Sequence, residues 1–303
     1  MKNILNNKKV IGHLLATFTI LIWGTTFIAT KLLLVDFTPL EILFFRFLLG
    51  YLALLVVKPK FIKPVSWKQE GVFFLASISG ISLYQYLENL SIDYSTASNV
   101  SIIIACAAFF TAIISKIILK DEEINKLFYV GFVVSIVGVA LVSFNGNIET
   151  GIFPIGDLIA LVASVLWGFY SVFVKMASRY NYSPLLVTRR IMFYGTIVLV
   201  PFLFIGNTNL SLARFADMEN LFLMLFLGVL ASAVCFFTWN LAVEYIGAVK
   251  TGLYVYFNPV VTIIFGIIIL DEKLTVMSVI GTLLIFAGLY LSSIKEKQKV
   301  EVN

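Results

Sequence analysis

Glu88 is the residue whose type and position point most directly to chemistry. It lies in the sequence Tyr-Gln-Tyr-Leu-Glu-Asn-Leu, residues 84–90, at the end of a long apolar stretch. A charge inside the hydrocarbon of a membrane is costly, so such a residue is expected to face a cavity or a partner. Two interpretations are open. Glu88 is a counter-ion for a substrate amine or a proton-coupling group, or it is a structural acid paired with Arg46 or Lys31.

Asn258-Pro259 is the second candidate, because it places a proline inside an apolar run. A proline within a helix removes a backbone hydrogen bond and frees the carbonyl near residue 255. Membrane proteins tolerate such breaks where the backbone faces protein or a water-filled cavity. Tyr254 and Asn258 are four residues apart, which predicts that they share a helix face. Either Asn258 hydrogen-bonds substrate in a cavity wall, or the break is a structural kink.

Aromatic residues form a third group, and they are Trp23, Tyr84, Tyr86, Trp167, Tyr170 and Trp239. An aromatic cavity suits amino acids, amines or ring-bearing metabolites, through apolar contact and cation–π attraction. The alternative is that each ring packs against neighbours or lies at the membrane interface. All of these except Tyr86 join Glu88, Tyr254 and Asn258 in the predicted substrate-binding set, with Pro259 as the helix break. Asn89 and Asn240 are expected to hydrogen-bond across helices.

Enzymatic and ATP-driven chemistry find little support. His13 is the only histidine, and Cys106 and Cys235 lie inside apolar runs that predict small buried side chains. The chain has neither the GxSxG pattern of a serine hydrolase nor the GxxxxGK[ST] pattern of a P-loop. We therefore expect no catalytic residues, no metal and no cofactor.

The composition indicates which solvent surrounds the protein. Of 303 residues, 60% are hydrophobic and 13% are charged, and the mean hydropathy is +0.99. Soluble domains are about half apolar and about a quarter charged, so this chain has too few charges to cover a water-facing surface. We predict an all-α integral membrane protein with the lipid bilayer as a partner. The net charge of +5 does not indicate nucleic acid, because where the charges lie matters more than their sum.

Charged residues and turn formers divide the chain into ten apolar stretches of about the length that a bilayer requires, about 20 residues. Their ranges are 10–30, 40–57, 71–87, 94–115, 127–148, 158–174, 191–213, 220–243, 251–270 and 274–294. With the N-terminus inside, 18 lysines and arginines fall on the cytoplasmic side and four outside. The excess of positive charge predicts cytoplasmic tails, residues 1–9 and 295–303, in a multi-pass plasma-membrane protein.

The chain also matches itself at a nearly constant offset. At 144 residues, Trp23-Gly24, Lys31 and Arg46 correspond to Trp167-Gly168, Lys175 and Arg190. At 151, Asn89–Ala97 corresponds to Asn240–Ala248, and at 150 Gly131 and Gly138 correspond to Gly281 and Gly288. These glycines, with Ser135, are expected to let helices pack closely. The pairs Asp121-Glu122 and Asp271-Glu272 are expected at solvated helix ends.

Each half has five predicted spans, and five is odd. The second half must therefore enter the membrane from the side opposite to the first, which gives an inverted repeat. Many secondary transporters use this architecture for alternating access around a midplane site. On this topology Lys31 lies outside, where cations are disfavoured, so a partner such as Glu41 or Glu88 is expected.

Several of these features together resemble the EamA domain. They are Trp-Gly followed by Lys in the first span, Leu90–Ser98 at the junction between the third and fourth spans, the acidic pair after the fourth span, and Gly131 with Gly138 in the fifth span. Two such domains, 10–145 and 154–294, are similar to the ten-helix EamA transporters of the drug/metabolite transporter superfamily. One departure is that Ala107-Ala108 stands where the second half has Asn258-Pro259. If family members place a helix-breaking proline at a central cavity, only the second half keeps that proline.

The resemblance implies transport of a small metabolite, often an amino acid, without ATP. We expect efflux of an amino acid or a related amine or aromatic compound, with proton coupling among the alternatives. A channel or a membrane protein without transport activity is the competing interpretation, and an intramembrane enzyme has the weakest support. The sequence leaves the oligomeric state open, with a homodimer among the alternatives.

Overall fold

The computed structural model describes residues 2–60, 63, 66–120, 125–144, 154–205 and 208–293. The predicted tail 295–303 and the acidic pair Asp121-Glu122 lie outside the described residues. The described chain consists of helices joined by short loops, which confirms the predicted all-α class.

Residues 2–144 form the first set of helices. They are α1 (Lys2–Leu33), α2 (Pro39–Val57), α3 (Trp67–Ala76), the π-helical segment η1 (Ser77–Leu83), α4 (Tyr84–Tyr94), α5 (Ala97–Ile104), α6 (Ala107–Ile118) and α7 (Lys126–Phe144). Local sequence explains where α2 begins. Thr38 and Glu41 form a capping box, with Thr38 N donating to Glu41 Oε2 at 3.0 Å, and Pro39 stands in the first turn.

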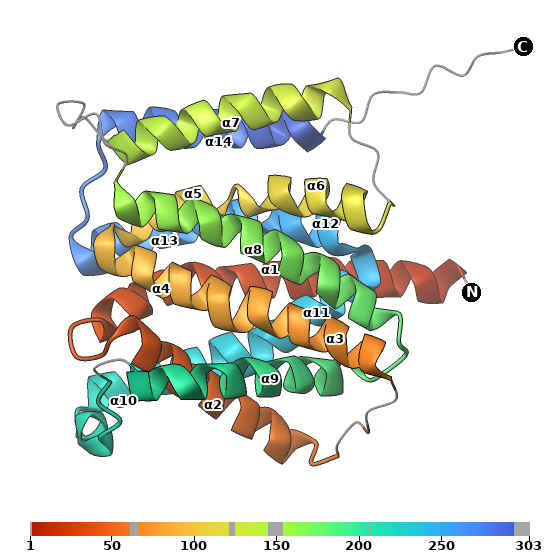
Figure 1. The fold of residues 1–303 in the computed structure, drawn as a ribbon. Coiled ribbons are helices and arrows are strands. Elements are labelled where there is room, and N and C mark those ends of the chain that lie inside the picture. The colour runs from red at the N-terminus through yellow and green to blue at the C-terminus, as the bar shows by residue number, and fades with distance from the viewer. Residues whose placement is uncertain are drawn as a thin grey trace, which may run out of the picture.

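Residues 155–293 form the second set. They are α8 (Ile155–Ser178), α9 (Pro184–Ile205), the 3₁₀ turn η3 (Leu212–Ala216), α10 (Met218–Leu225), the π-helical segment η4 (Phe226–Val234), α11 (Cys235–Ile246), α12 (Ala248–Gly252), the 3₁₀ turn η5 (Leu253–Phe257), α13 (Asn258–Leu270) and α14 (Val276–Ser293). Figure 1 shows the helices in layers, with α7 and α14 paired along one edge and α2 and α9 toward the other.

Eight helices in the described part of the chain are long and apolar enough to cross a membrane, and Val276–Ser292 is a shorter apolar helix. The eight are Asn7–Leu33, Pro39–Val57, Ala97–Ile118, Lys126–Phe144, Ile155–Ser178, Pro184–Ile205, Met218–Ile246 and Ala248–Leu270. The predicted third span, 71–87, lies in the continuous run from α3 to α4, where polar residues such as Gln85 and Glu88 lower the hydropathy. A total of ten spans stays a prediction.

The predicted seventh span, 191–213, is placed too far along the chain. The helix there is α9, which begins at Pro184 and ends at Ile205. Its first turns contain Arg189 and Arg190, which the predicted span places in the preceding loop. Arg189 donates to the backbone carbonyl oxygens of residues 58 and 60. These bonds satisfy its charge within the helix, whereas the sequence suggested that the helix begins after it.

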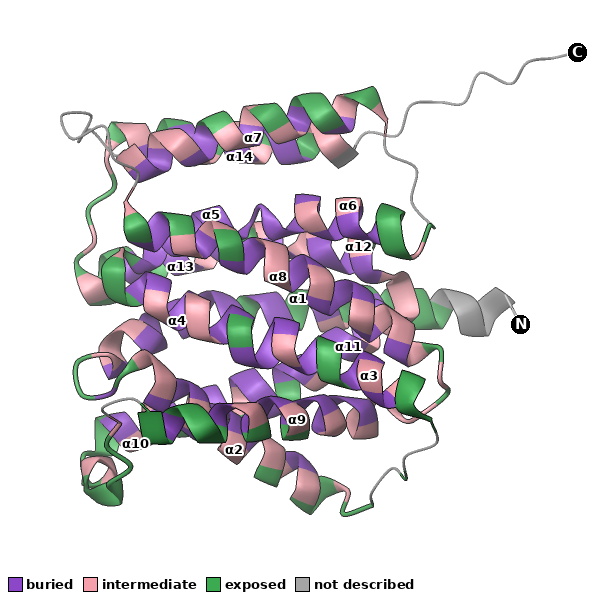
Figure 2. Cartoon of the chain, in the orientation of Figure 1, coloured by how far each residue is buried: buried purple, intermediate pink, exposed green. Residues whose placement is uncertain are grey.

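The two halves interlock. α1 packs against α11 and α13 of the second half, and its counterpart α8 packs against α4 and α6 of the first half. Figure 2 shows buried residues concentrated in these middle layers. The buried share is 72% in Ala97–Ile118 but 39% in Lys126–Phe144 at the edge. A site at the centre is therefore built from both halves.

Irregular segments recur at equivalent places in the two halves. The π-helical segments η1 and η4 precede α4 and α11, which correspond in the repeat. Span 9 changes from α12 to α13 through η5, as Asn258-Pro259 predicts. Span 4 is also interrupted, at residues 105–106 between α5 and α6. The first half therefore has an interruption at the equivalent place without a proline, and the proline itself stands only in the second half.

Helices α7 and α14 are in direct backbone contact through their glycines. A β-carbon added to Gly138 would lie 2.5 Å from the carbonyl oxygen of Gly281, and Gly131 faces Gly288 in the same way. Ser135 Oγ donates to the carbonyl oxygen of Ile285 at 3.0 Å. The pairing confirms the predicted close packing. Because higher numbers on α7 meet lower numbers on α14, these equivalent helices run antiparallel, as an inverted repeat requires.

The repeated lysines have equivalent partners. Lys31 Nζ donates to the carbonyl oxygens of Ile92 and Ser95, at 2.6 and 3.0 Å. Lys175 Nζ donates to those of Val243 and Glu244, at 3.5 and 3.3 Å. Each lysine thus satisfies carbonyl groups at the C-terminal end of α4 or α11, where a cation is favoured. The expectation that Lys31 pairs with Glu41 or Glu88 is wrong.

Glu41 instead anchors the loop before α10. Arg214 Nη1 donates to Glu41 Oε2 at 2.8 Å, and its guanidinium lies 4.0 Å from the centre of the Phe37 ring. Phe215 packs against the Phe37 and Phe45 rings. The loop is therefore fixed across the junction between α1 and α2.

Glu272 fixes another helix end. Its Oε1 accepts from the backbone N–H of Ala97 at 2.8 Å, and Oε2 accepts from that of Ser98 at 3.1 Å. The first turn of a helix has N–H groups without a partner in the helix itself, and a carboxylate is favoured there. Glu272 satisfies two such groups of α5. The prediction of a solvated role is wrong for Glu272.

Candidate functional site

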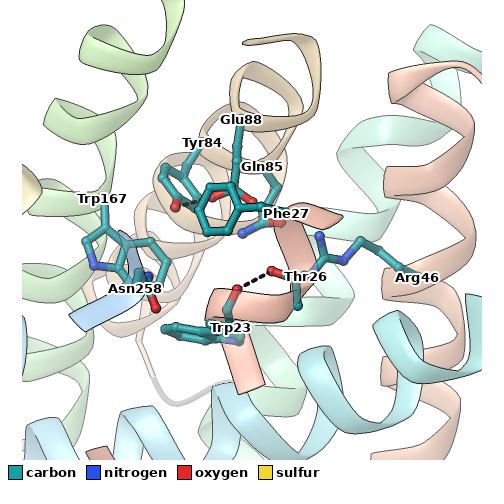
Figure 3. A pocket seen from close by; sticks show the side chains of 9 residues that line it. All are labelled: Trp23, Thr26, Phe27, Arg46, Tyr84, Gln85, Glu88, Trp167 and Asn258. Atoms are coloured by element: carbon teal, nitrogen blue, oxygen red, sulfur yellow. Dashed lines mark hydrogen bonds between the residues drawn. The ribbon is translucent and has the colours of Figure 1, made fainter. Parts of the chain in front are cut away.

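A pocket lies where the two halves meet (Figure 3). It contains about 270 Å³ of empty space. Side chains from α1, α2, α4, α8 and α13 line it, and they are Trp23, Thr26, Phe27, Arg46, Tyr84, Gln85, Glu88, Trp167 and Asn258. Its lining combines one cation, one carboxyl group, two amides and several rings. Such a mixture of apolar walls and a few convergent polar groups is typical of small-molecule sites.

Arg46 is the cation of this pocket, and it is almost fully buried, with 1% of its surface exposed. Its Nε donates to Ser232 Oγ at 3.2 Å, whereas Nη1 has no hydrogen-bond partner within the described structure. The repeat counterpart Arg190 forms an ion pair with Glu70 at 2.7 Å. The two equivalent arginines thus have different roles. Arg190 belongs to a structural ion pair in the second half, and Arg46 faces the pocket in the first half.

Glu88 is the carboxyl group of the pocket and is 5% exposed. It accepts a hydrogen bond from the hydroxyl of Tyr84, one turn earlier on α4. Glu88 and Arg46 attract each other through their charges, but among the described ion pairs none joins Glu88 to Arg46 or to Lys31. The structural interpretation of Glu88 as half of such a pair is therefore not supported.

Four polar atoms of the lining lack hydrogen-bond partners among the described residues. Two are donors, Arg46 Nη1 and Trp167 Nε1, and two are acceptors, Gln85 Oε1 and Asn258 Oδ1. Buried polar atoms in proteins are nearly always hydrogen-bonded, to protein or to water. Four such atoms around one pocket therefore indicate a place for a polar ligand or ordered water.

The rings form one continuous cluster. Trp23 and Trp167, the equivalent tryptophans of the two halves, meet edge to face with ring centres 5.2 Å apart. Tyr84 lies 4.7 Å from Trp167 on the pocket side. Two further rings pack behind them. The ring centre of Trp239 lies 5.1 Å from that of Trp23, and the ring centre of Tyr170 lies 4.9 Å from that of Trp167. The cluster gives the pocket a rigid apolar wall.

The structure separates the predicted site residues into three groups. Trp23, Tyr84, Glu88, Trp167 and Asn258 line the pocket. Trp239 and Tyr170 are buried in the ring cluster but do not line the pocket, and Pro259 is buried beside Asn258 in the first turn of α13. Asn89 and Asn240 bond across helices as predicted, to Pro39 O at 3.1 Å and Thr188 Oγ1 at 2.9 Å.

Tyr254 lies away from the pocket, and its predicted place is wrong. Its hydroxyl is hydrogen-bonded to His13 Nδ1 at 2.7 Å. The reason is local: Tyr254 lies in η5, whose 3₁₀ geometry has three residues per turn. A spacing of four residues therefore no longer brings Tyr254 and Asn258 to one face.

Arg46, Gln85, Thr26 and Phe27 line the pocket although the sequence analysis did not place them there. Two signals were available. Arg46 is a charged residue within an apolar span, just as Glu88 is. Gln85 is three residues before Glu88 and so faces the same side of a helix.

The two equivalent helices α4 and α11 differ in polarity beside the pocket. At the offset of 151 residues, Gln85 and Glu88 correspond to Phe236 and Trp239. Both of these are buried in the ring cluster around Trp23. The repeat supplies the framework, and α4 contributes a polar pair to the lining where the equivalent helix α11 contributes rings.

Comparison with known proteins agrees with this architecture. The model of the EamA-like transporter family matches residues 10–144 and again residues 154–294. The chain therefore belongs to the EamA-like transporter family and is a multi-pass membrane transporter.

Individual relatives support the same class. An uncharacterized transporter of Archaeoglobus fulgidus is 31% identical over 292 residues, which cover 94% of this chain and 98% of the relative. The uncharacterized transporter YyaM of Bacillus subtilis is 28% identical over 280 residues, covering 89% of both chains. One solved crystal structure has the same fold, with a TM-score of 0.64 and 15% identity, over 95% of this chain and 96% of the other.

Proposed function

We propose that the protein is a secondary transporter for small zwitterionic amino acids, which it exports across the plasma membrane by alternating access. The observation that carries this proposal is a buried guanidinium with a free donor, Arg46, beside a buried carboxyl group, Glu88, in an aromatic pocket. This pair matches the two charges that every free amino acid has.

The chemistry of the pocket gives each part of an amino acid a partner. The substrate carboxylate accepts from Arg46 Nη1, because charge-assisted bonds from arginine to carboxylates are strong. The substrate ammonium donates to Glu88 and to Asn258 Oδ1, and the rings of Trp23 and Trp167 attract its charge. The side chain is left to apolar contacts with Phe27 and the ring cluster.

The size of the pocket favours small substrates. Its empty space of about 270 Å³ includes the open solvent at its mouth, so the volume enclosed by the lining side chains is smaller still. We therefore favour amino acids with small apolar or hydroxyl side chains over bulky aromatic metabolites.

Alternating access is supported by the interlocked halves. α1 and α8 exchange equivalent contacts with the opposite half, and the pocket lies between them. In an inverted repeat, the two halves can exchange conformations and expose the same site to opposite sides of the membrane. The lysine and arginine bias of the loops supports a cytoplasmic position for both termini.

The test begins with purified protein in detergent. A thermal-shift screen of the common amino acids should show stabilisation by small ones, because a ligand that binds the folded state raises its apparent stability. Arg46→Gln should abolish that shift, and Glu88→Gln should reduce it. Asp93→Asn is the matched control, because Asp93 is an exposed carboxylate on the same helix α4, and it should leave the shift unchanged.

Flux measurements distinguish a carrier from the channel alternative. In proteoliposomes, uptake of the stabilising amino acid should saturate and should be accelerated by the same amino acid inside. A non-saturating conductance would refute the proposal. Efflux is tested in cells loaded with the amino acid through a dipeptide, where expression of the protein should lower the amount retained.

A further inference from the structure

The lining of the pocket is electrically balanced. Arg46 contributes one positive charge and Glu88 one negative charge, and the other lining residues are uncharged. The remaining charges near them are engaged elsewhere. On α1, Lys31 is bound to carbonyl oxygens at the end of α4; on α2, Glu41 is paired with Arg214; and Asp93 is exposed. Tyr84 is the titratable neighbour on α4 itself, and it donates to Glu88.

This balance limits which ligands the pocket can hold. A buried charge without a counter-charge is strongly unfavourable. A zwitterion adds one charge of each sign, so the pocket stays balanced. A carboxylate without an amine adds a negative charge, and an amine without a carboxylate adds a positive one.

The two imbalances are not equivalent, because the two side chains differ in chemistry. Glu88 can take up a proton and become neutral, after which Arg46 and the carboxylate ligand balance each other. Tyr84 suits the neutral form as well, since its hydroxyl can either donate or accept a hydrogen bond. Arg46 cannot lose its proton in a protein, so an amine that engages Glu88 leaves a buried positive charge.

We propose that the pocket has a second class of substrate, small monocarboxylates without an amine, and that each binds together with one proton held by Glu88. Amines without a carboxylate are excluded. The proposal rests on the amino-acid pocket proposed above and adds a rule to it. Zwitterions cross without a proton, and monocarboxylates cross with one.

The test uses three compounds that differ only in their charged groups: valine, 3-methylbutanoate, which lacks the amine, and 2-methylpropylamine, which lacks the carboxylate. Binding to the purified wild-type protein is measured by titration calorimetry in two buffers with different heats of ionisation. The difference in heat between the buffers gives the number of protons taken up. We expect none for valine, close to one for 3-methylbutanoate, and no binding of the amine.

Glu88→Gln removes the group that takes the proton, and Asp93→Asn is again the control. In Glu88→Gln, 3-methylbutanoate should bind without proton uptake and with no dependence on pH. Valine should bind at least about tenfold more weakly, because its ammonium loses a charged partner. An infrared difference spectrum provides a second readout. A protonated carboxyl band should arise when wild-type protein binds 3-methylbutanoate, and it should be missing with valine or in Glu88→Gln.

The outcomes separate this inference from the proposed function. Binding of 3-methylbutanoate without proton uptake, persistence of proton uptake in Glu88→Gln, or binding of the amine as tight as that of the carboxylate would each overturn the inference while leaving amino-acid binding intact. Proton-linked binding of 3-methylbutanoate without any binding of valine would overturn the amino-acid proposal instead. Failure of all three compounds to bind overturns both. The proton count in wild-type protein decides the matter even where the variant does not fold.

Discussion

Replacing Gly138 by alanine tests the close backbone contact between α7 and α14. The added β-carbon would lie 2.5 Å from the carbonyl oxygen of Gly281, 2.8 Å from Ile285 Cγ1 and 2.9 Å from Ile285 N. Two of these atoms belong to the backbone of α14 and cannot rotate away. The helices α7 and α14 must therefore separate, which breaks the packing that the glycines permit.

The expected effect is a difference between two terms. Overpacking a well-packed contact costs about 1–3 kcal/mol. Alanine is a better helix former than glycine, and this returns about 0.5–1 kcal/mol. Gly138→Ala should therefore lower the free energy of unfolding by roughly 1–2 kcal/mol.

Gly71→Ala is the matched control. Gly71 also lies inside a helix, α3, but an added β-carbon meets no atom within 4 Å. Only the helix-propensity term applies, so this variant should be about 0.5–1 kcal/mol more stable than wild type. Thermal unfolding of both variants in the same detergent, followed by intrinsic fluorescence, should shift the midpoint in opposite directions. Equal or higher stability of Gly138→Ala would refute the close contact between α7 and α14.

Four further predictions concern buried or capping side chains. Lys31→Met and Lys175→Met should each lower the thermal unfolding midpoint, because each loss leaves helix-end carbonyls without a charged donor, at a cost of about 1–3 kcal/mol; an unchanged midpoint for Lys31→Met would contradict the capping role. Trp23→Phe should cost about 1 kcal/mol or more, since its indole donates to the Ala231 carbonyl at 2.9 Å in η4. Trp167→Phe removes a donor without a described partner, so it should weaken ligand binding more than stability in the thermal-shift screen. Arg214→Ala should cost about 2 kcal/mol by leaving a buried carboxylate unpaired, and loss of protection against proteolysis in the preceding loop would accompany it.

Part of the site was predictable because some of its signals are local. Glu88 stands out as a charge in an apolar span, and Trp23 and Trp167 stand out because the repeat preserves them. Arg46 stands out in the same way, but its lack of a carboxylate partner was not predictable, since the equivalent arginine of the other half, Arg190, pairs with Glu70. Whether an arginine finds a carboxylate depends on the neighbouring helix, and for Arg46 that neighbour is Ser232, 186 positions away.

The sequence by itself determined the class of the protein and its duplication. The composition has too few charges to cover a mainly water-facing surface, and correspondences such as Lys31 with Lys175 reveal two halves. Both properties depend only on the order and types of the residues. Only the tertiary structure decided what those residues contact. It placed both lysines on helix-end carbonyls and turned Tyr254 away from the pocket through a 3₁₀ turn. It also placed Arg46 and Glu88 in one pocket without a direct ion pair to either among the described residues, because their surroundings come from packing between halves that are distant in sequence.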